Sequence, residues 1–433
     1  MRSDTNMIRT YDISRREFLE AGALTLGGLA FVQHGLNSIP SVRGAEKKLP
    51  ELPPTRTITH GPRHHWFGYY DKLQFDPTSR YVLGMEVDFE HRSPLPEDEL
   101  KIGMIDIEDN DRWIELGSST AWCWQQGCML QWLPGSKSTI VWNDRGESSY
   151  ICRILDVRTK EMRTIPHPIY ALHPDGRNAI ATDFRRLGDT RPGYGYNGIA
   201  DPFADDVAPK ESGIFHVDLV TGEQKLLISI ADVVAFGPQL PSMKEGKHWF
   251  NHLLFNQDGS RFVFLHRWSV GMGRLTRMVT ARTDGSDLRV LDANGLTSHF
   301  IWRDPNHILS WSNQPTHGPR FYLFEDSDGG AIEVVGENEM TQDAHCSYLP
   351  GNEWILNDSY PDKDRLQHPY LYHVESKRIV PLGHFLSPPE YTKEWRCDTH
   401  PRFSPNGKYV VIDSPHQDEG RQLHLIDISK IVG

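Results

Sequence analysis

The feature that most constrains the fold is a unit that recurs along the chain. It consists of an apolar strand, a turn rich in Pro, Asp and Gly, and a second β-prone run. Residues 73–77 with 81–87 form the first copy, and residues 401–407 with 408–412 form the last. Self-similar units of this size are typical of propellers and solenoids, in which each unit packs against its neighbours. The other copies begin at residues 130, 170, 253, 300 and 346.

Seven copies predict an all-β fold, a seven-bladed β-propeller that occupies residues 46–433 as a single domain. Residues 55–60 are β-prone and precede the first copy, so we expect this N-terminal strand to complete the last blade. Such closure removes the exposed sheet edges at the seam of the ring. The extra length is expected in insertions, notably residues 188–212 and 359–368.

The N-terminal residues 1–45 are predicted to be a twin-arginine export signal and linker. Arg15 and Arg16 stand in the pattern S-R-R-x-F-L, before the mildly apolar residues 21–32. That run is short and Gly-rich for a spanning helix, which needs roughly 20 apolar residues. An ordinary secretory signal or a membrane anchor is the alternative. We expect a periplasmic or secreted protein that has no membrane association after export.

The charge balance restricts the ligand class. Lys and Arg total 46 against 58 Asp and Glu, a net charge of −12, which argues against general nucleic-acid binding. An anionic ligand in a locally basic pocket remains compatible with this balance. The five cysteines are an odd number and too few for a disulfide scaffold, although Cys123 and Cys128 are candidates for one pair.

Histidine recurs at one position of the repeat. Aligning the turns places one residue of each copy at the register expected to line the central channel, and four consecutive copies carry His there. Imidazoles that converge away from water need a metal or a ligand as partner. Cys397 lies close by in sequence, and tetrahedral N/S sites favour Zn²⁺. We therefore predict one divalent metal ion, with Zn²⁺ preferred, held by His252, His345, Cys397 and His400.

Arginine and aromatic side chains surround this register. Arginines follow blades three and four, and an insertion begins at Arg191, which suggests a ligand that bears carboxylates. Aromatic groups with polar tips precede the first two blades, as in surfaces on which sugar rings pack. Solvated surface arginines and propeller packing are the alternatives. The predicted substrate-binding residues are His64, His65, Tyr69, Gln126, Arg191 and Tyr196.

Several stretches resemble oligogalacturonate lyases and, more loosely, propeller-fold ulvan lyases. They are residues 64–72, 251–266, 298–302, 343–345 and 397–402, and the resemblance covers most of the mature chain. Cys397 stands where the family has a Gln, and Arg402 where it has a second His. The family's sites are of the Mn²⁺ type, and the thiol shifts our prediction toward Zn²⁺. Tyr170 and Arg186 have the spacing of a catalytic pair in the ulvan lyases.

The resemblance implies an exported polysaccharide lyase that cleaves uronic-acid-containing oligosaccharides or polysaccharides by β-elimination. His299 would be the base, Arg277 or Arg186 would pair with the substrate carboxylate, and Tyr170 or His266 would protonate the leaving O4. The partner is then an anionic glycan, bound by a monomer or weak oligomer. The alternatives are a non-catalytic periplasmic glycan-binding propeller and a metal-dependent hydrolase.

Overall fold

The computed structural model describes residues 51–433, which form one unit. The predicted export signal and the predicted boundary at residue 46 lie outside the described residues. Within residues 51–433, no helix has the length and apolar character needed to cross a membrane.

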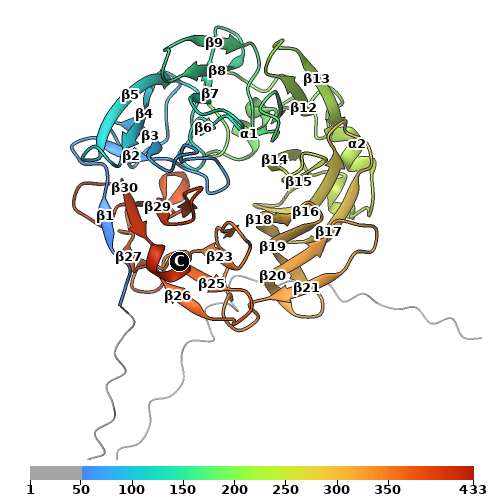
Figure 1. Ribbon diagram of the computed structural model, residues 1–433. Coiled ribbons are helices and arrows are strands. Elements are labelled where there is room, and N and C mark those ends of the chain that lie inside the picture. The colour runs from blue at the N-terminus through green and yellow to red at the C-terminus, as the bar shows by residue number, and fades with distance from the viewer. Residues whose placement is uncertain (1–50) are drawn as a thin grey trace, which may run out of the picture. The chain divides into compact units, whose positions relative to one another are not determined.

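Seven sheets of four antiparallel strands are arranged around a common axis, so the predicted seven-bladed propeller is confirmed (Figure 1). Blades one to three are β2 (His64–Trp66), β3 (Tyr81–Val87), β4 (Leu100–Asp106), β5 (Arg112–Ser119); β6 (Gln131–Trp132), β7 (Thr139–Arg145), β8 (Tyr150–Asp156), β9 (Met162–Ile165); and β10 (Ala171–Leu172), β11 (Asn178–Thr182), β12 (Gly213–Asp218), β13 (Gln224–Ser229). Blades four and five are β14 (His248–Phe255), β15 (Arg261–Val270), β16 (Gly273–Arg282), β17 (Arg289–Gly295); and β18 (Thr297–Asp304), β19 (His307–Gln314), β20 (Gly318–Glu325), β21 (Ile332–Val335). Blades six and seven are β22 (Ser347–Tyr348), β23 (Trp354–Asn357), β25 (Tyr370–His373), β26 (Ile379–Pro381); and β28 (Arg402–Phe403), β29 (Tyr409–Ser414), β30 (Gln422–Asp427), β1 (Thr55–Thr57).

The ring closes through β1, the predicted N-terminal strand. β1 pairs antiparallel with β30, in a register that places Thr55 opposite Ile426 and Thr57 opposite His424. The last blade therefore combines both ends of the propeller, and its outer strand comes from the start of the chain (Figure 1). The predicted closure is confirmed.

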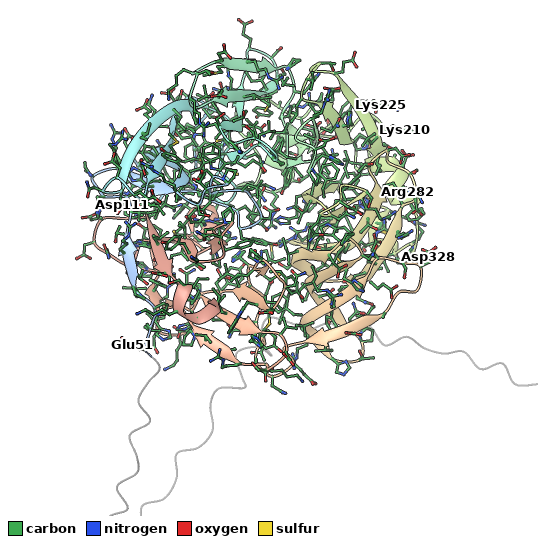
Figure 2. All side chains as sticks on the ribbon, in the orientation of Figure 1. Glu51, Asp111, Lys210, Lys225, Arg282 and Asp328 are labelled. Atoms are coloured by element: carbon green, nitrogen blue, oxygen red, sulfur yellow. The ribbon has the colours of Figure 1, made fainter. Side chains whose placement is uncertain are left out.

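The core lies between adjacent blades because each sheet buries both of its faces. Trp66, Trp122 and Trp124 pack together, with ring centroids 5.1–5.6 Å apart, in the cluster shared by the first two blades. Charged residues such as Lys225 and Arg282 lie at the rim instead (Figure 2). The predicted Cys123–Cys128 pair is wrong, since both thiols are free and buried.

Short helices and one small sheet lie outside the blades. The predicted insertion at residues 188–212 lies within blade three, between β11 and β12, and the chain enters it through α1 (Phe184–Thr190), whose N-cap Asp183 accepts a hydrogen bond from the Arg185 amide. The second predicted insertion contributes β24 (Leu366–Gln367), which pairs with β27 (Phe385–Leu386). The remaining helices are α2 (Ile230–Ala235), η1 (Pro241–Met243), η2 (Lys393–Trp395) and α3 (Ser429–Val432).

The innermost position of blade one is interrupted by a loop that reaches the axis. β2 pairs with one end of β3, and Phe75 bridges to Val82 at the other end, so residues 67–73 leave the sheet between them. The Tyr70 hydroxyl donates to the carbonyl of Phe300 on β18 (2.7 Å) and accepts from its amide (3.0 Å). This loop therefore ties blade one to blade five across the centre.

Candidate active site and metal centre

The structure brings the four histidines of the common register together. All are buried, and ring centroids are 6.3 Å apart for His252 and His299, 4.3 Å for His299 and His345, and 4.3 Å for His345 and His400. Tyr69, from the loop of blade one, stacks on His252 at 4.8 Å and lies 5.4 Å from His400. The imidazoles thus surround a phenol ring in the middle of the propeller.

Local irregularities of the inner strands direct these side chains. The pairing of β14 with β15 shifts between Asn251 and Leu254, and His252 there has a φ of 54°. The pairing of β18 with β19 shifts between Thr297 and Phe300, around His299. Bulges of this kind re-aim a side chain without ending the strand. They help to aim the side chains of His252 and His299 at one centre from two different blades.

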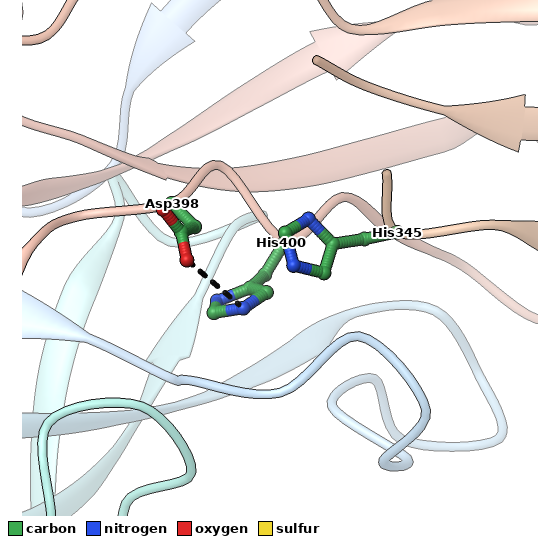
Figure 3. Close-up of side chains that lie close together, drawn as sticks. All are labelled: His345, Asp398 and His400. Carbon is green, nitrogen blue, oxygen red and sulfur yellow. Dashed lines mark ion pairs between the residues drawn. The ribbon is translucent and has the colours of Figure 1, made fainter. Parts of the chain in front are cut away.

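Within this centre, the side chains of His345, Asp398 and His400 form a group suited to a metal ion (Figure 3). One potential ligand atom from each lies within 4.8 Å of the others, and His400 Nε2 is 3.9 Å from Asp398 Oδ2. The Nε2 atoms of His345 and His400 are buried and have no hydrogen-bond partner among residues 51–433. Unsatisfied buried imidazole nitrogens are costly, so the donor set fits a divalent cation.

Asp358 orients one of these ligands. Its carboxylate accepts from the His345 amide (2.9 Å), lies 3.0 Å from His345 Nδ1 and accepts from the Thr399 hydroxyl (2.5 Å). Burial by itself would raise the pKa of the Asp358 carboxyl, but the interactions with His345 and Thr399 hold it below its usual range. An ionised Asp358 accepts the Nδ1 proton and leaves the Nε2 lone pair directed at the group.

Replacing Asp358 with Asn is expected to weaken binding of Mn²⁺ or Zn²⁺ by about 10–100-fold, because the amide no longer fixes the His345 tautomer. Calorimetric titration of the metal-free protein measures this. The matched control is Asp304→Asn, which breaks a similar carboxylate contact to His307 (2.8 Å) away from the axis and leaves affinity unchanged. Equal affinities for wild type and Asp358→Asn would contradict the assignment.

Two predicted metal ligands, Cys397 and His252, lie outside this group. Asp398, and not Cys397, offers a ligand atom next to those of His345 and His400. Burial raises the pKa of the Cys397 thiol, which opposes the thiolate form that metals bind. His252 Nε2 is instead 3.2 Å from the Tyr69 hydroxyl.

A cavity of about 550 Å³ opens beside the histidines and is strongly basic. Arg267 is buried there, and its Nε and Nη1 find no hydrogen-bond partner within the described part of the chain. Burial, together with Arg191 and Arg274, lowers the pKa of Arg267. A buried, unpaired guanidinium needs an anion. The charged lining residues are Arg191, Arg267, Arg274, Asp343, Lys393, Glu394 and Arg396.

His299 lines the same cavity and is held by a carboxylate. Its Nδ1 lies 2.9 Å from Asp343 Oδ1 and 3.2 Å from the Ser298 hydroxyl. A hydrogen bond from Nδ1–H to Asp343 leaves the Nε2 lone pair as a proton acceptor. The predicted base therefore has the geometry of an oriented general base.

A second cavity of about 570 Å³ lies where the inner strands end, at the turns of the repeats. Its lining includes Leu254, Phe255, Ile301 and Trp302, which follow His252 and His299 along β14 and β18. The two cavities therefore occupy opposite ends of the channel. The titratable groups described above gather in the basic one.

Three predicted catalytic residues are engaged elsewhere. The guanidinium of Arg277 donates to the carbonyls of Val233, Phe236 and Pro238 and to His266, so its N–H groups are occupied. His266 is held between Arg277 and His248 (2.8 Å). The structure therefore directs the polar atoms of Arg277 and His266 to partners within the fold, and the predicted pairing of Arg277 with a carboxylate and the predicted proton donation by His266 stay predictions.

The guanidinium of Arg186, the third of these residues, is also bonded within the fold. Its guanidinium donates to the carbonyls of His248, Phe203, Asp206 and Val207 and pairs with Asp201 (3.2 Å). These contacts tie the insertion after α1 to blade four. Arg186 is thus an anchor of the insertion and has no N–H group left for a substrate.

The other predicted residues divide between the centre and the packing around it. Tyr170 is fully buried, and its hydroxyl accepts from the His252 amide (2.9 Å) and bonds to Gln126. His65 contacts Gln422 and Glu86, and His64 contacts Glu90. The Tyr196 hydroxyl accepts from Asn143. Arg191, by contrast, lines the basic cavity.

Sequence reasoning missed Asp398, Asp343, Arg267, Tyr194 and Arg396, each adjacent or near to a residue that it selected. Side chains of adjacent residues in a strand face opposite ways. On β15 the residue that lines the basic cavity is therefore Arg267, and its selected neighbour His266 faces the other way. The D-x-H pattern of Asp398 and His400 is a usable signal, since it keeps a carboxylate and an imidazole two residues apart in the chain.

The comparisons with known proteins agree with this architecture. No protein-family model and no curated protein sequence matches the chain. The structure is similar to an oligogalacturonate lyase from Vibrio parahaemolyticus, with a TM-score of 0.59, 15% identity, and 86% of this chain and 93% of that chain covered. It is also similar to an oligogalacturonate lyase in complex with manganese, with a TM-score of 0.63, 14% identity, and coverage of 87% and 93%. At these identities the likeness concerns the fold.

Proposed function

We propose that the protein is a lyase that cleaves uronic-acid-containing glycans by β-elimination. The observation that carries the proposal is the shared cavity, which combines an oriented His299 with the buried and unpaired guanidinium of Arg267. The structural similarity to oligogalacturonate lyases supports the same reaction class. We further propose twin-arginine export to the periplasm or medium, and an anionic glycan as the partner.

The reaction begins at C5 of a 4-linked uronic acid. Arg267 and Arg274 pair with the carboxylate and stabilise the negative charge that develops when the C5 proton leaves. His299 Nε2 accepts that proton while Asp343 holds the opposite ring nitrogen. The C5–H electrons form the C4=C5 bond, the C4–O4 bond breaks, and O4 leaves with a proton.

A divalent cation fits next to this base, held by His345, Asp398 and His400. When bound, it supplies positive charge that stabilises the developing enolate. Without the thiolate of Cys397, the reason to prefer Zn²⁺ no longer applies, and two imidazoles with a carboxylate suit Mn²⁺ as well. The related lyase was solved with manganese.

The proposal is tested by incubating the protein with fragments of pectin, ulvan and glucuronan. We expect ultraviolet absorbance from an unsaturated product on at least one of them, lost after chelation and restored by Mn²⁺ or Zn²⁺. New reducing ends without absorbance would indicate a metal-dependent hydrolase. Binding without either signal would indicate a glycan-binding propeller, and both outcomes would overturn the lyase proposal.

A further inference from the structure

Tyr194 stands out among the cavity residues because arginines surround its phenol. The insertion turns sharply at Gly193 (φ 90°), packs against Glu394 and places Tyr194 in the cavity wall. Arg396 Nη2 donates to the Tyr194 hydroxyl at 2.8 Å, and the Arg191 guanidinium lies 4.1 Å from the ring centroid. The phenol is buried, and its own O–H donates to no residue in the range 51–433.

The charges around Tyr194 favour its ionised form. Arg396, Arg191, Arg267 and Arg274 face the phenol, and Asp398 is the opposing charge. Burial by itself would raise the pKa of Tyr194, but Arg396 and Arg191 outweigh it and lower the pKa to about 7. A group with a pKa near neutrality gives up and regains a proton readily.

Tyr194 and the base both lie next to His252 in the wall of one cavity. The Tyr194 ring is 5.8 Å from the His252 ring, and the His299 ring is 6.3 Å from it. A sugar seated over His252 would therefore be close to two groups that can transfer a proton. Elimination needs such a pair, since a proton leaves C5 and another reaches O4.

We infer that Tyr194 is the catalytic acid that protonates the leaving O4 of the glycan. The inference rests on the proposed lyase function and replaces the predicted donors Tyr170 and His266, whose polar atoms are engaged by neighbouring residues. As the C4–O4 bond breaks, the Tyr194 O–H bond breaks and O4 takes the proton. The resulting tyrosinate is stabilised by Arg396 and Arg191 and regains a proton from water after the product leaves.

The test compares Tyr194→Phe with wild type on two substrates. One is the uronic-acid oligosaccharide that wild type cleaves, and the other is a uronide with fluoride at C4, which departs without a proton. We expect Tyr194→Phe to lose about 10²–10⁴-fold in kcat on the oligosaccharide and to match wild type on the fluoride. Equal loss on both substrates, or full activity on the oligosaccharide, would overturn the acid role.

The matched control is Tyr150→Phe. Its hydroxyl donates to the Tyr196 carbonyl (3.0 Å), so the variant loosens the same insertion without altering the cavity lining. Any loss caused by a displaced insertion is expected to be equal on the two substrates. A Tyr150→Phe variant with the leaving-group dependence of Tyr194→Phe would overturn the inference. Wild-type protein inactive on both substrates would overturn the proposed lyase function, and the acid assignment with it.

Discussion

Replacing His299 with Gln is expected to lower kcat for formation of the unsaturated product by about 10²–10⁴-fold, with little change in KM. The amide still bonds to Asp343 but cannot accept the C5 proton. Stopped-flow or steady-state ultraviolet absorbance measures the rate, and thermal unfolding checks that the variant folds. The loss is expected to be as large as that of Tyr194→Phe on the oligosaccharide, because each variant removes one of the two proton-transfer groups.

Two companion variants separate chemistry from structure. Asp343→Asn keeps His299 but weakens its orientation, so we expect a partial loss of kcat. His307→Gln removes an imidazole that contacts Asp304 at the opposite end of an inner strand, and it is expected to keep wild-type activity. If His299→Gln turned over the glycan at the wild-type rate, another group would be the base.

Replacing Arg267 with Met is expected to change stability and activity in opposite directions. The buried guanidinium has two nitrogen atoms, Nε and Nη1, without hydrogen-bond partners among the described residues. An apolar side chain of similar length removes this uncompensated charge and is expected to stabilise the free protein by about 1–4 kcal/mol. The same change removes the pairing with the substrate carboxylate and raises KM. Thermal unfolding in a buffer without carboxylates, and kinetics on the oligosaccharide, measure the two effects.

The control is Arg277→Met, on the neighbouring strand. Arg277 is also buried, but its guanidinium donates hydrogen bonds to backbone carbonyls and to His266. The Met variant leaves these buried acceptors without a donor. We expect it to destabilise the protein by about 3–5 kcal/mol. If Arg267→Met were destabilised to the same degree, Arg267 would be a structural residue and not an anion site.

The blades were predictable because each repeat carries its own strand and turn signals. Alternating apolar residues and the Pro-Asp-Gly turns are local, and β3 spans the predicted residues 81–87. The closing strand was predictable as well. The last blade would otherwise expose the edge of its sheet, and the β-prone segment ahead of the first repeat is available to cover that edge. The convergence of His252, His299, His345 and His400 followed from the common register.

The partners of these histidines were not predictable from spacing. Bulges in β14 and β18, and the left-handed backbone of His252 and His400, change which side a residue faces, and one step reverses the direction of a side chain. Cys397 was selected where Asp398 meets the ligands, and His266 where Arg267 meets the cavity. Asp358 follows β23 in the same blade as His345, and Asp343 precedes β22 in the blade after His299, so no local signal connects these carboxylates with the histidines that they orient.

The sequence by itself determined the number of blades, the closure of the ring and the four axial histidines, because these follow from periodicity within each repeat. Only the tertiary structure decided which carboxylates orient the histidines, which arginine is left without a partner, and that Tyr194 reaches the cavity. Those contacts join separate strands of one blade, different blades, and an irregular insertion. Their geometry depends on how the blades pack around one axis, which no single repeat encodes.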